Sequence, residues 1–189
     1  MRVVLVAALL IALASPALAG GNEGVWGYIT FDPAAVVTDT IPAPYSTVNA
    51  YICFSGIQMG FTSASFRLND VAAECPGSFA PPSFVNTISD VAVGNIFTGI
   101  TVAAQDCVVE PTVCVGYLSL FYLGTGSCCV KLLEHPDYPR WVTDCNDPAQ
   151  VDTYCVHAHG SIAGGDCPPN ECDSPATPET WSSIKALYR

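Results

Sequence analysis

Apolar residues recur at every second position over several short stretches of this chain, which is the period of a half-buried β-strand. Residues 47–54 and 61–69 show the alternation most cleanly. Their apolar positions are Val48, Ala50, Ile52 and Phe54 in the first stretch, and Ala64, Phe66 and Leu68 in the second. We expect further strands within residues 25–31, 84–93, 129–135 and 154–162.

The longest β-prone stretch covers residues 95–123, where two apolar runs flank a polar insert. The insert lies between Cys107 and Cys114 and contains Pro111, so it is typical of an exposed turn. We therefore predict a central β-hairpin closed by a Cys107–Cys114 disulfide.

About seven to nine short strands with turn signals between them, and no long amphipathic helix, are typical of a sandwich. The predicted fold is all-β: a single disulfide-stapled β-sandwich, Ig-like or jelly-roll, over residues 20–172. Residues 173–189 form a linker and a short C-terminal tail, helical or disordered.

The first 19 residues have the organisation of a signal peptide. Arg2 supplies a positive start, residues 3–14 are apolar, and an A-x-A site ends at Ala19. The apolar run is shorter than the roughly 20 residues that span a bilayer. We expect cleavage after Ala19, no membrane span in the mature chain, and an extracellular or cell-envelope location.

Ten cysteines follow the predicted cleavage site, and an even number in an exported chain indicates disulfides. We expect disulfides to close the intervening loops and the hairpin, as Cys53–Cys75, Cys107–Cys114 and Cys145–Cys155. Cys128 and Cys129 are adjacent in sequence, and we expect them to pair with Cys167 and Cys172.

The charge balance limits the partners. The chain carries 17 acidic and 6 basic residues, a net charge of −11. Such a chain repels nucleic acid and anionic lipid. A protein or a glycan remains as the expected ligand.

The C-terminal tail has apolar residues at helical spacing, namely Trp181, Ile184, Leu187 and Tyr188. About ten residues do not hold a helix alone in water. We expect the tail either to dock on its own domain or to engage the export machinery.

The ending T-W-x-x-I-K-x-L-Y-R, from Thr180 to Arg189, resembles the tail of a group of secreted bacterial proteins with cysteine-rich β-domains. The resemblance covers about ten residues. It implies a secreted or envelope protein and implies no catalytic residue.

A metal site is the sharpest chemical hypothesis. Cys155, His157 and His159 alternate along one strand, so a regular strand projects all three from one face. Cysteine and histidine are ligands for zinc and copper. The competing interpretation makes Cys155 a disulfide partner.

A second metal hypothesis concerns calcium. It rests on an oxygen-rich loop with Asp144, Asn146, Asp147 and Asp152.

Aromatic residues suggest a ligand platform. Trp141 and Tyr138 lie in a polar, proline-rich loop and are the exposed candidates for stacking on a sugar. Trp26 and Tyr154 are either further members or part of the core.

Catalytic motifs are absent from the sequence. There is no G-x-S-x-G elbow, and only three histidines are available as a base. We expect no enzyme and no cofactor. The sequence favours a non-enzymatic binding or structural module, with a zinc- or copper-binding protein using His157 and His159 as the alternative.

Overall fold

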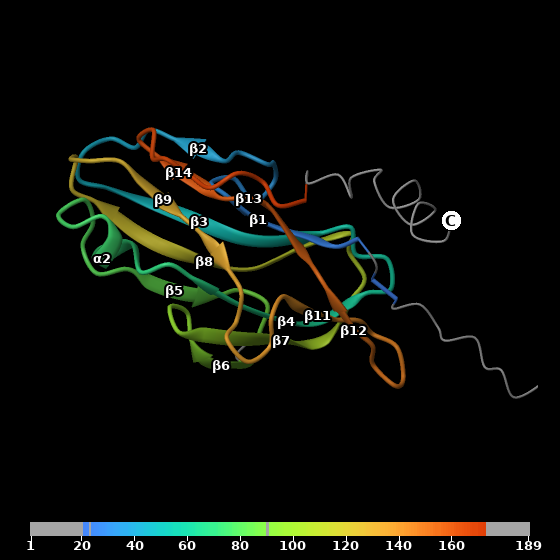
Figure 1. Ribbon diagram of the computed structural model, residues 1–189. Helices are drawn as coiled ribbons and strands as arrows, with labels where there is room; N and C mark the ends of the chain where they lie inside the picture. Colours follow the sequence, from blue (N-terminus) through green and yellow to red (C-terminus); the bar gives the residue numbers. More distant parts are fainter. Residues whose placement is uncertain (1–20, 23, 90, 173–189) are drawn as a thin grey trace, which may run out of the picture.

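Strands dominate the computed structural model, which describes residues 21–22, 24–89 and 91–172 (Figure 1). They form two main sheets, called here the first and the second sheet, and a small third one. The first sheet has the order β13 (Cys155–Ala158), β1 (Trp26–Thr30), β3 (Ser46–Ser55), β8 (Thr112–Tyr122) and β5 (Ser83–Asn86). The second has the order β12 (Val151–Thr153), β11 (Trp141–Thr143), β4 (Phe61–Leu68), β7 (Gly99–Val108) and β6 (Val91–Asn95), and β10 (Leu132–Leu133) also pairs with β4. The third consists of β2 (Asp39–Thr40), β14 (Gly160–Ile162) and β9 (Cys128–Val130).

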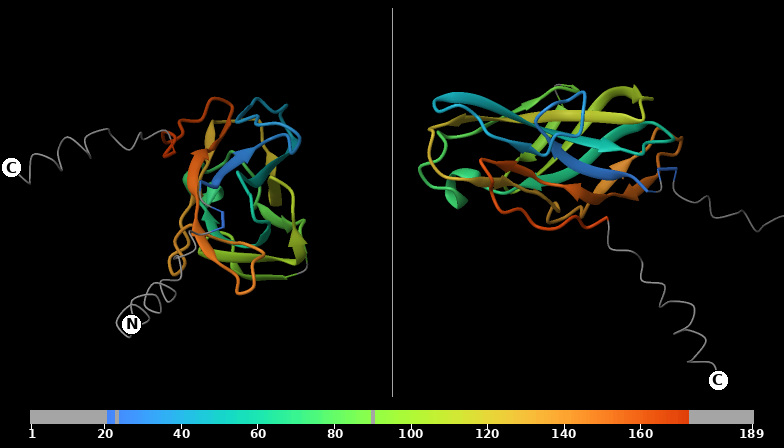
Figure 2. Two further views of the ribbon diagram at one scale, coloured as in Figure 1. Left: turned by 90° about the vertical axis from the view of Figure 1, so that its right-hand side faces the viewer. Right: turned by 90° about the horizontal axis from the view of Figure 1, so that it is seen from above.

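The first and second sheets lie face to face as the two layers of a β-sandwich (Figure 2). This confirms the predicted fold class. Within the described residues the helical segment is α2 (Val71–Glu74), which lies between β4 and β5. Asp70 caps it, because its carboxylate accepts hydrogen bonds from the backbone N–H groups of Ala72 and Ala73.

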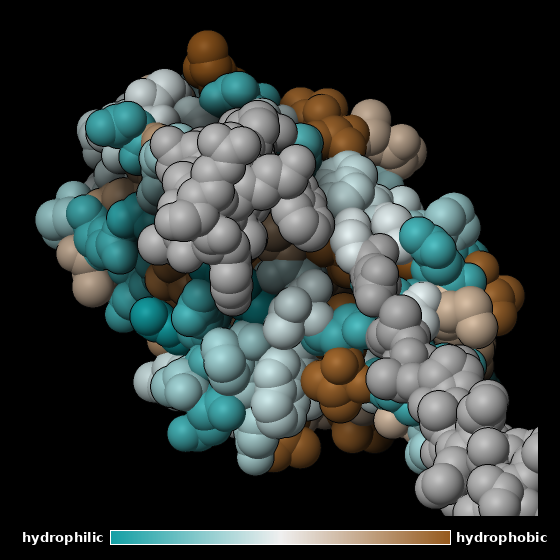
Figure 3. All heavy atoms as spheres, turned by 45° about the vertical axis from the view of Figure 1, so that its right-hand side comes forward, coloured by the Kyte–Doolittle hydropathy of each residue, from teal (hydrophilic) through white to brown (hydrophobic). Residues whose placement is uncertain are grey.

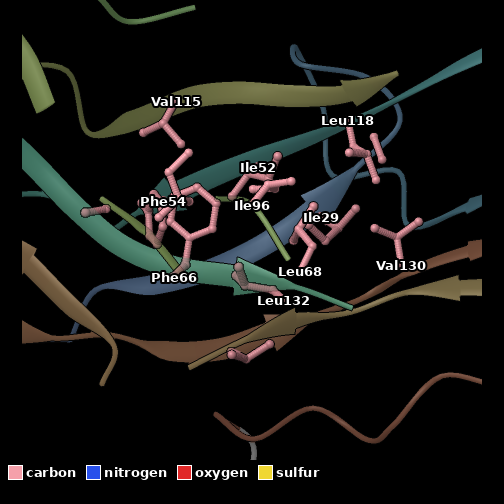
Figure 4. Packing of buried hydrophobic residues seen from close by; sticks show 14 of the residues in the cluster. Ile29, Ile52, Phe54, Phe66, Leu68, Ile96, Val115, Leu118, Val130 and Leu132 are labelled. Atoms are coloured by element: carbon pink, nitrogen blue, oxygen red, sulfur yellow. The ribbon is translucent and has the colours of Figure 1, made fainter. Parts of the chain in front are cut away.

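The core lies between the two sheets. Ile52 and Phe54 of β3 meet Phe66 and Leu68 of β4, and all four side chains are fully buried (Figure 4). The ring centroids of Phe54 and Phe66 are 5.9 Å apart. Burying each such side chain contributes about 1.5–3 kcal/mol relative to leaving it exposed. The alternation seen in residues 47–54 and 61–69 is confirmed, since its apolar face is the buried one.

The predicted hairpin of residues 95–123 is wrong. β7 pairs with β4 and β6 in the second sheet, whereas β8 pairs with β3 and β5 in the first. The short connection between them crosses from one layer to the other. The carbonyl of Pro111 accepts hydrogen bonds from the backbone N–H groups of Gly56 and Ile57, so this connection is tied to the loop after β3.

The predicted strand 84–93 divides into two strands in different sheets. The backbone N–H of Thr87 donates to Val115 in the first sheet, and the hydroxyl of Ser89 donates to the carbonyl of Ala103 in the second. The chain therefore changes layer between these two residues.

Five disulfides connect the ten cysteines, and most of the predicted pairs are wrong. The observed pairs are Cys53–Cys114, Cys75–Cys128, Cys107–Cys145, Cys129–Cys167 and Cys155–Cys172. Cys129–Cys167 is one of the combinations expected, and Cys128 and Cys129 do have different partners. Pairing neighbours in sequence failed because strands that touch in this fold are distant in sequence. Cys53 and Cys114, for example, lie on adjacent strands with Cα atoms 3.9 Å apart, but are 61 residues apart.

The predicted signal peptide (1–19) and the C-terminal tail (173–189), including Trp181, Ile184, Leu187 and Tyr188, lie outside the described residues. Among the residues described, no helix is both long and apolar enough to cross a membrane.

Candidate protein-docking face

The outer face of the second sheet carries ten side chains from five neighbouring strands. Buried residues such as Val102 and Val142 point into the core, so the residues that alternate with them point outward. Cross-strand partners share this face, for example Val93 with Thr101 and Val91 with Ala103. We call this surface the neutral face. Its residues are Val91, Val93, Thr101, Ala103, Ser63, Ser65, Trp141, Thr143, Val151 and Thr153.

None of these ten residues is charged, although the whole chain has a net charge of −11. The face combines small hydroxyl side chains with exposed apolar ones. Val93 is 70% exposed, and Val91 and Val151 are also exposed. The hydroxyls of Ser65 and Thr101 lie 2.8 Å apart and hydrogen-bond to each other across the strands. The result is an uncharged sheet face on an acidic molecule.

Hydrophobic residues on the side of the molecule seen in Figure 3 lie in small groups between hydrophilic ones. Isolated exposed apolar residues are normal on a protein surface. On the neutral face, exposed valines alternate with hydroxyl side chains, so the face is distinguished by its lack of charge over five strands.

Aromatic rings border the neutral face at the loop between β10 and β11. The ring of Tyr138 lies between those of His135 and Trp141, with centroid distances of 5.0 Å on each side. Tyr138 is exposed, and Trp141 is 38% exposed. The structure thus brings the two predicted platform residues together, with tilted rings.

His135 anchors this loop. Its Nδ1 accepts hydrogen bonds from the backbone N–H groups of Asp137 and Tyr138, and the ring packs on Gly99. A Cβ at position 99 would lie 2.8 Å from His135 Nε2, and the positive φ of 138° also requires glycine. The loop conformation that presents Tyr138 therefore depends on a residue in β7.

A cavity of about 610 Å³ lies next to this loop and contains Arg67. Arg67 follows Ser65 by two positions on β4, so it extends the neutral face. Its Nε donates to the carbonyl of Glu134. Among the described basic side chains, Lys131 pairs with Glu74, and Arg140 pairs with Glu134 and Glu171, but Arg67 has no ion pair.

The free edge of the second sheet at β6 is partly blocked. The side chain of Asn86 donates a hydrogen bond to the carbonyl of Val91. The backbone N–H of Val91 donates to the hydroxyl of Ser89. Blocked edges disfavour pairing with another chain. The edge is therefore occupied at Val91, where β6 begins.

The predicted metal site does not form. Cys155 is bonded to Cys172, and His157 Nδ1 lies 3.0 Å from the side-chain nitrogen of Asn170. The pairing with β1 shifts register beside His157, so β13 loses its alternation and His159 turns inward. His159 is 6% exposed, its Nδ1 accepts from the N–H of Leu132, and burial lowers its pKa. Within the described ranges, no group of three or more acidic, histidine or cysteine side chains has the geometry of a metal site.

The predicted calcium loop is closed by its own hydrogen bonds. Asp144 is fully buried, and its carboxylate accepts from the backbone N–H groups of Asn146 and Gln150 and from the side chain of Asn146. The carboxylate of Asp152 accepts from the backbone N–H of Asn22. The carboxylates therefore serve the loop structure.

Trp26 and Tyr154 do not join the Tyr138–Trp141 pair. Tyr154 is buried, and its hydroxyl donates to the carbonyl of Ser65 while burial raises its pKa. Trp26 lies against Tyr28 and His157 on the outer face of the first sheet. Of the two alternatives predicted for Tyr154, a place in the platform or in the core, the structure shows the core.

Comparison with known proteins gives a fold. Neither a family model nor a curated protein matches the chain. A chain of a complex between a variant of CaDoc0917 and CaCohA2, solved at pH 5.5, is 15% identical with a TM-score of 0.50, and the alignment covers 73% of this chain and 97% of that one. The solution structure of CaCohA2 from Clostridium acetobutylicum is 14% identical with a TM-score of 0.50, and covers 79% and 96%. A chain of the Coh-OlpC–Doc435 type I cohesin–dockerin complex from Clostridium thermocellum is 10% identical, with a TM-score of 0.49 and coverage of 76% and 96%.

At these identities the likeness is one of fold, and the first two structures carry it. A shared fold does not by itself imply a shared function. The function has to be argued from the surfaces of this chain.

Proposed function

We propose that this chain is a non-enzymatic module that binds another protein through the neutral face. The observation that carries the proposal is the charge distribution. The ten residues of the neutral face carry no charge over five strands, on a molecule whose net charge is −11. Interface cores are depleted in charged residues, as the neutral face is, and they are enriched in aromatic residues, which Trp141 and the adjacent Tyr138 supply here.

The structural neighbours support this proposal. The structure of CaDoc0917 with CaCohA2 is a complex of two different proteins, and the chain that resembles ours is one of its components. The proposed partner is therefore a different protein and not a second copy of this chain.

The neutral face also constrains the partner. Like the face itself, the partner's contact surface is mostly uncharged, since a buried unpaired charge costs several kcal/mol. Arg67, which has no ion pair among the described residues and lies at one end of the face, provides a position for a single carboxylate of the partner. Five disulfides suit an extracellular setting, where such a module would act.

Site-specific photo-crosslinking tests the proposal. A benzoylphenylalanine replaces Val93 on the neutral face, or Val109, which is 82% exposed in the connection between β7 and β8, as the matched control. Each protein is irradiated in the secreted fraction of cells that produce it, and adducts are identified by mass spectrometry.

We expect a discrete protein adduct from position 93 that position 109 does not give. The identified partner is then produced alone and its binding measured by calorimetry. Equal adducts from both positions, or an adduct only with a second copy of this chain, would overturn the proposal.

A further inference from the structure

The outer face of the first sheet carries a second site, on the opposite side of the sandwich from the neutral face. A cavity of about 320 Å³ lies between β3 and the segment that leads from β1 into it. The residues that line it and matter here are Phe31, Thr40, Ser46, Thr47, Asn49 and Tyr51. Pockets that bind small ligands have volumes of about 300–1,000 Å³.

Asn49, which lines this cavity, carries an acceptor without a partner among the described residues. Its Oδ1 is buried and has no hydrogen-bond partner within the part of the chain that the structure describes. Leaving such a group unpaired costs about 1–3 kcal/mol. Asn49 lies on the outer face of β3, opposite Ser119 of β8, so it is not part of the core. A ligand that donates a hydrogen bond to this oxygen, once the amide turns toward the cavity, would offset this cost.

The described residues that line the cavity include no charged one. In a chain of net charge −11 an anionic ligand is repelled, and a cationic ligand finds no carboxylate in this lining. The ligand that fits is therefore neutral.

The lining combines hydroxyl groups with aromatic rings. Thr40 and Thr47 carry hydroxyls that can donate and accept hydrogen bonds, the Ser46 hydroxyl already donates to the carbonyl of Ala43 and can still accept, and Phe31 and Tyr51 provide apolar surfaces. Tyr51 is held by Tyr117 of β8, with ring centroids 5.3 Å apart. A sugar ring has the matching chemistry, because its rim carries hydroxyl donors and its faces carry C–H groups.

We propose that this cavity binds one ring of a neutral saccharide, with a ring hydroxyl donating to Asn49 Oδ1 and a ring face packed on Tyr51. The site is separate from the neutral face and does not depend on the proposed function. If both hold, the module joins a protein on one sheet to a glycan on the other.

Titration with defined saccharides tests this inference. The probes are the neutral hexasaccharides cellohexaose, mannohexaose and xylohexaose, with hexagalacturonate as the acidic comparison, followed by calorimetry and by NMR of the full mature chain. The variants are Asn49→Leu and Tyr51→Ala. Trp141→Ala is the control, since it changes an exposed aromatic residue on the other sheet.

We expect at least one neutral hexasaccharide to bind, and hexagalacturonate to bind at least tenfold more weakly. Asn49→Leu and Tyr51→Ala each lower the affinity at least tenfold, and Trp141→Ala leaves it unchanged. Asn49→Leu keeps or raises the melting temperature, because it removes an unpaired buried oxygen. If that variant does not fold, Thr47→Val takes its place with the same expected loss of affinity.

Three results would overturn the inference. One is no binding of any neutral probe at millimolar concentration. Another is affinity that survives both cavity variants. The third is loss of binding in Trp141→Ala alone, which would place the sugar on the Tyr138–Trp141 pair.

Discussion

The rings of Tyr138 and Trp141 lie 5.0 Å apart, centroid to centroid, with their planes at 40°. Trp141 belongs to β11 and Tyr138 to the loop before it, so a strand holds one ring and the His135-anchored loop holds the other. The pair forms a preorganised aromatic border of the neutral face. Large aromatic residues in such positions often dominate binding energy.

Trp141→Ala should weaken binding of the crosslinked partner about 30-fold or more, as expected for a loss of about 2 kcal/mol at an interface hot spot. The melting temperature should also fall, because most of the side chain is buried and packs on Tyr138, so binding is measured well below it. Phe121→Ala is the matched control, since Phe121 is 41% exposed on the outer face of the other sheet. Calorimetry with both variants checks the prediction, and equal losses would contradict it.

Arg67→Gln should weaken the same complex about tenfold or more, because a hydrogen bond to a charged group contributes about 1.5–3 kcal/mol. The remaining affinity should depend less on salt than that of the wild type. Lys131→Gln is the control, as it removes a cation that pairs with Glu74. A complex insensitive to Arg67→Gln at low ionic strength would show that no carboxylate docks there.

The local alternation of apolar and polar residues predicted most strands. It could not predict which strands pair with each other or which cysteines form disulfides, because these partners are distant in sequence. The alternation at Val48 to Phe54 depends only on which face is buried, and it is confirmed. The hairpin failed because the pairing partner of β8 is β3, far earlier in the chain, and nothing in the composition of either strand specifies that choice. The disulfides failed for the same reason.

The sequence predicted some residues of the candidate site and missed others. Tyr138 and Trp141 stood out as exposed aromatic residues, and they do lie together. Val91 and Val93 were missed because residues 84–93 were interpreted as one strand, which hides the change of sheet. Arg67 was missed as well, because its lack of an ion pair within the described residues depends on Glu134 pairing with Arg140 instead.

Gly60→Ala should destabilise the protein more than Gly77→Ala. Both glycines have a similar positive φ, 75° and 79°, so both variants pay the same backbone cost. A Cβ at position 60 would also lie 2.5 Å from Cys145 Sγ and 2.7 Å from Cys107 Sγ, whereas position 77 is open. Crowding of this kind costs about 1–3 kcal/mol. Thermal unfolding of both variants measures the difference, and equal melting temperatures would contradict the packing at this disulfide.

His159 should make stability fall at mildly acidic pH. Burial lowers its pKa below the ordinary 6.5, so the unfolded chain takes up a proton that the folded chain resists. Stability is therefore fully present above about pH 6.5 and is lost as the pH falls below it.

His159→Asn tests this point. Its side-chain oxygen can still accept from the N–H of Leu132, but it does not titrate in this range. The loss of melting temperature between about pH 7.5 and about pH 5 should be smaller in the variant than in the wild type. The same loss in both proteins would assign the pH dependence to other groups.

The affinity of Val93 variants for the crosslinked partner tests the central claim most directly. Val93 is 70% exposed, so Val93→Asp and Val93→Lys should fold like the wild type. Both should weaken binding at least tenfold, because either charge is buried against an uncharged surface. Val109→Asp, on the connection between β7 and β8, should bind normally. Unchanged affinity in both Val93 variants would contradict docking on the neutral face.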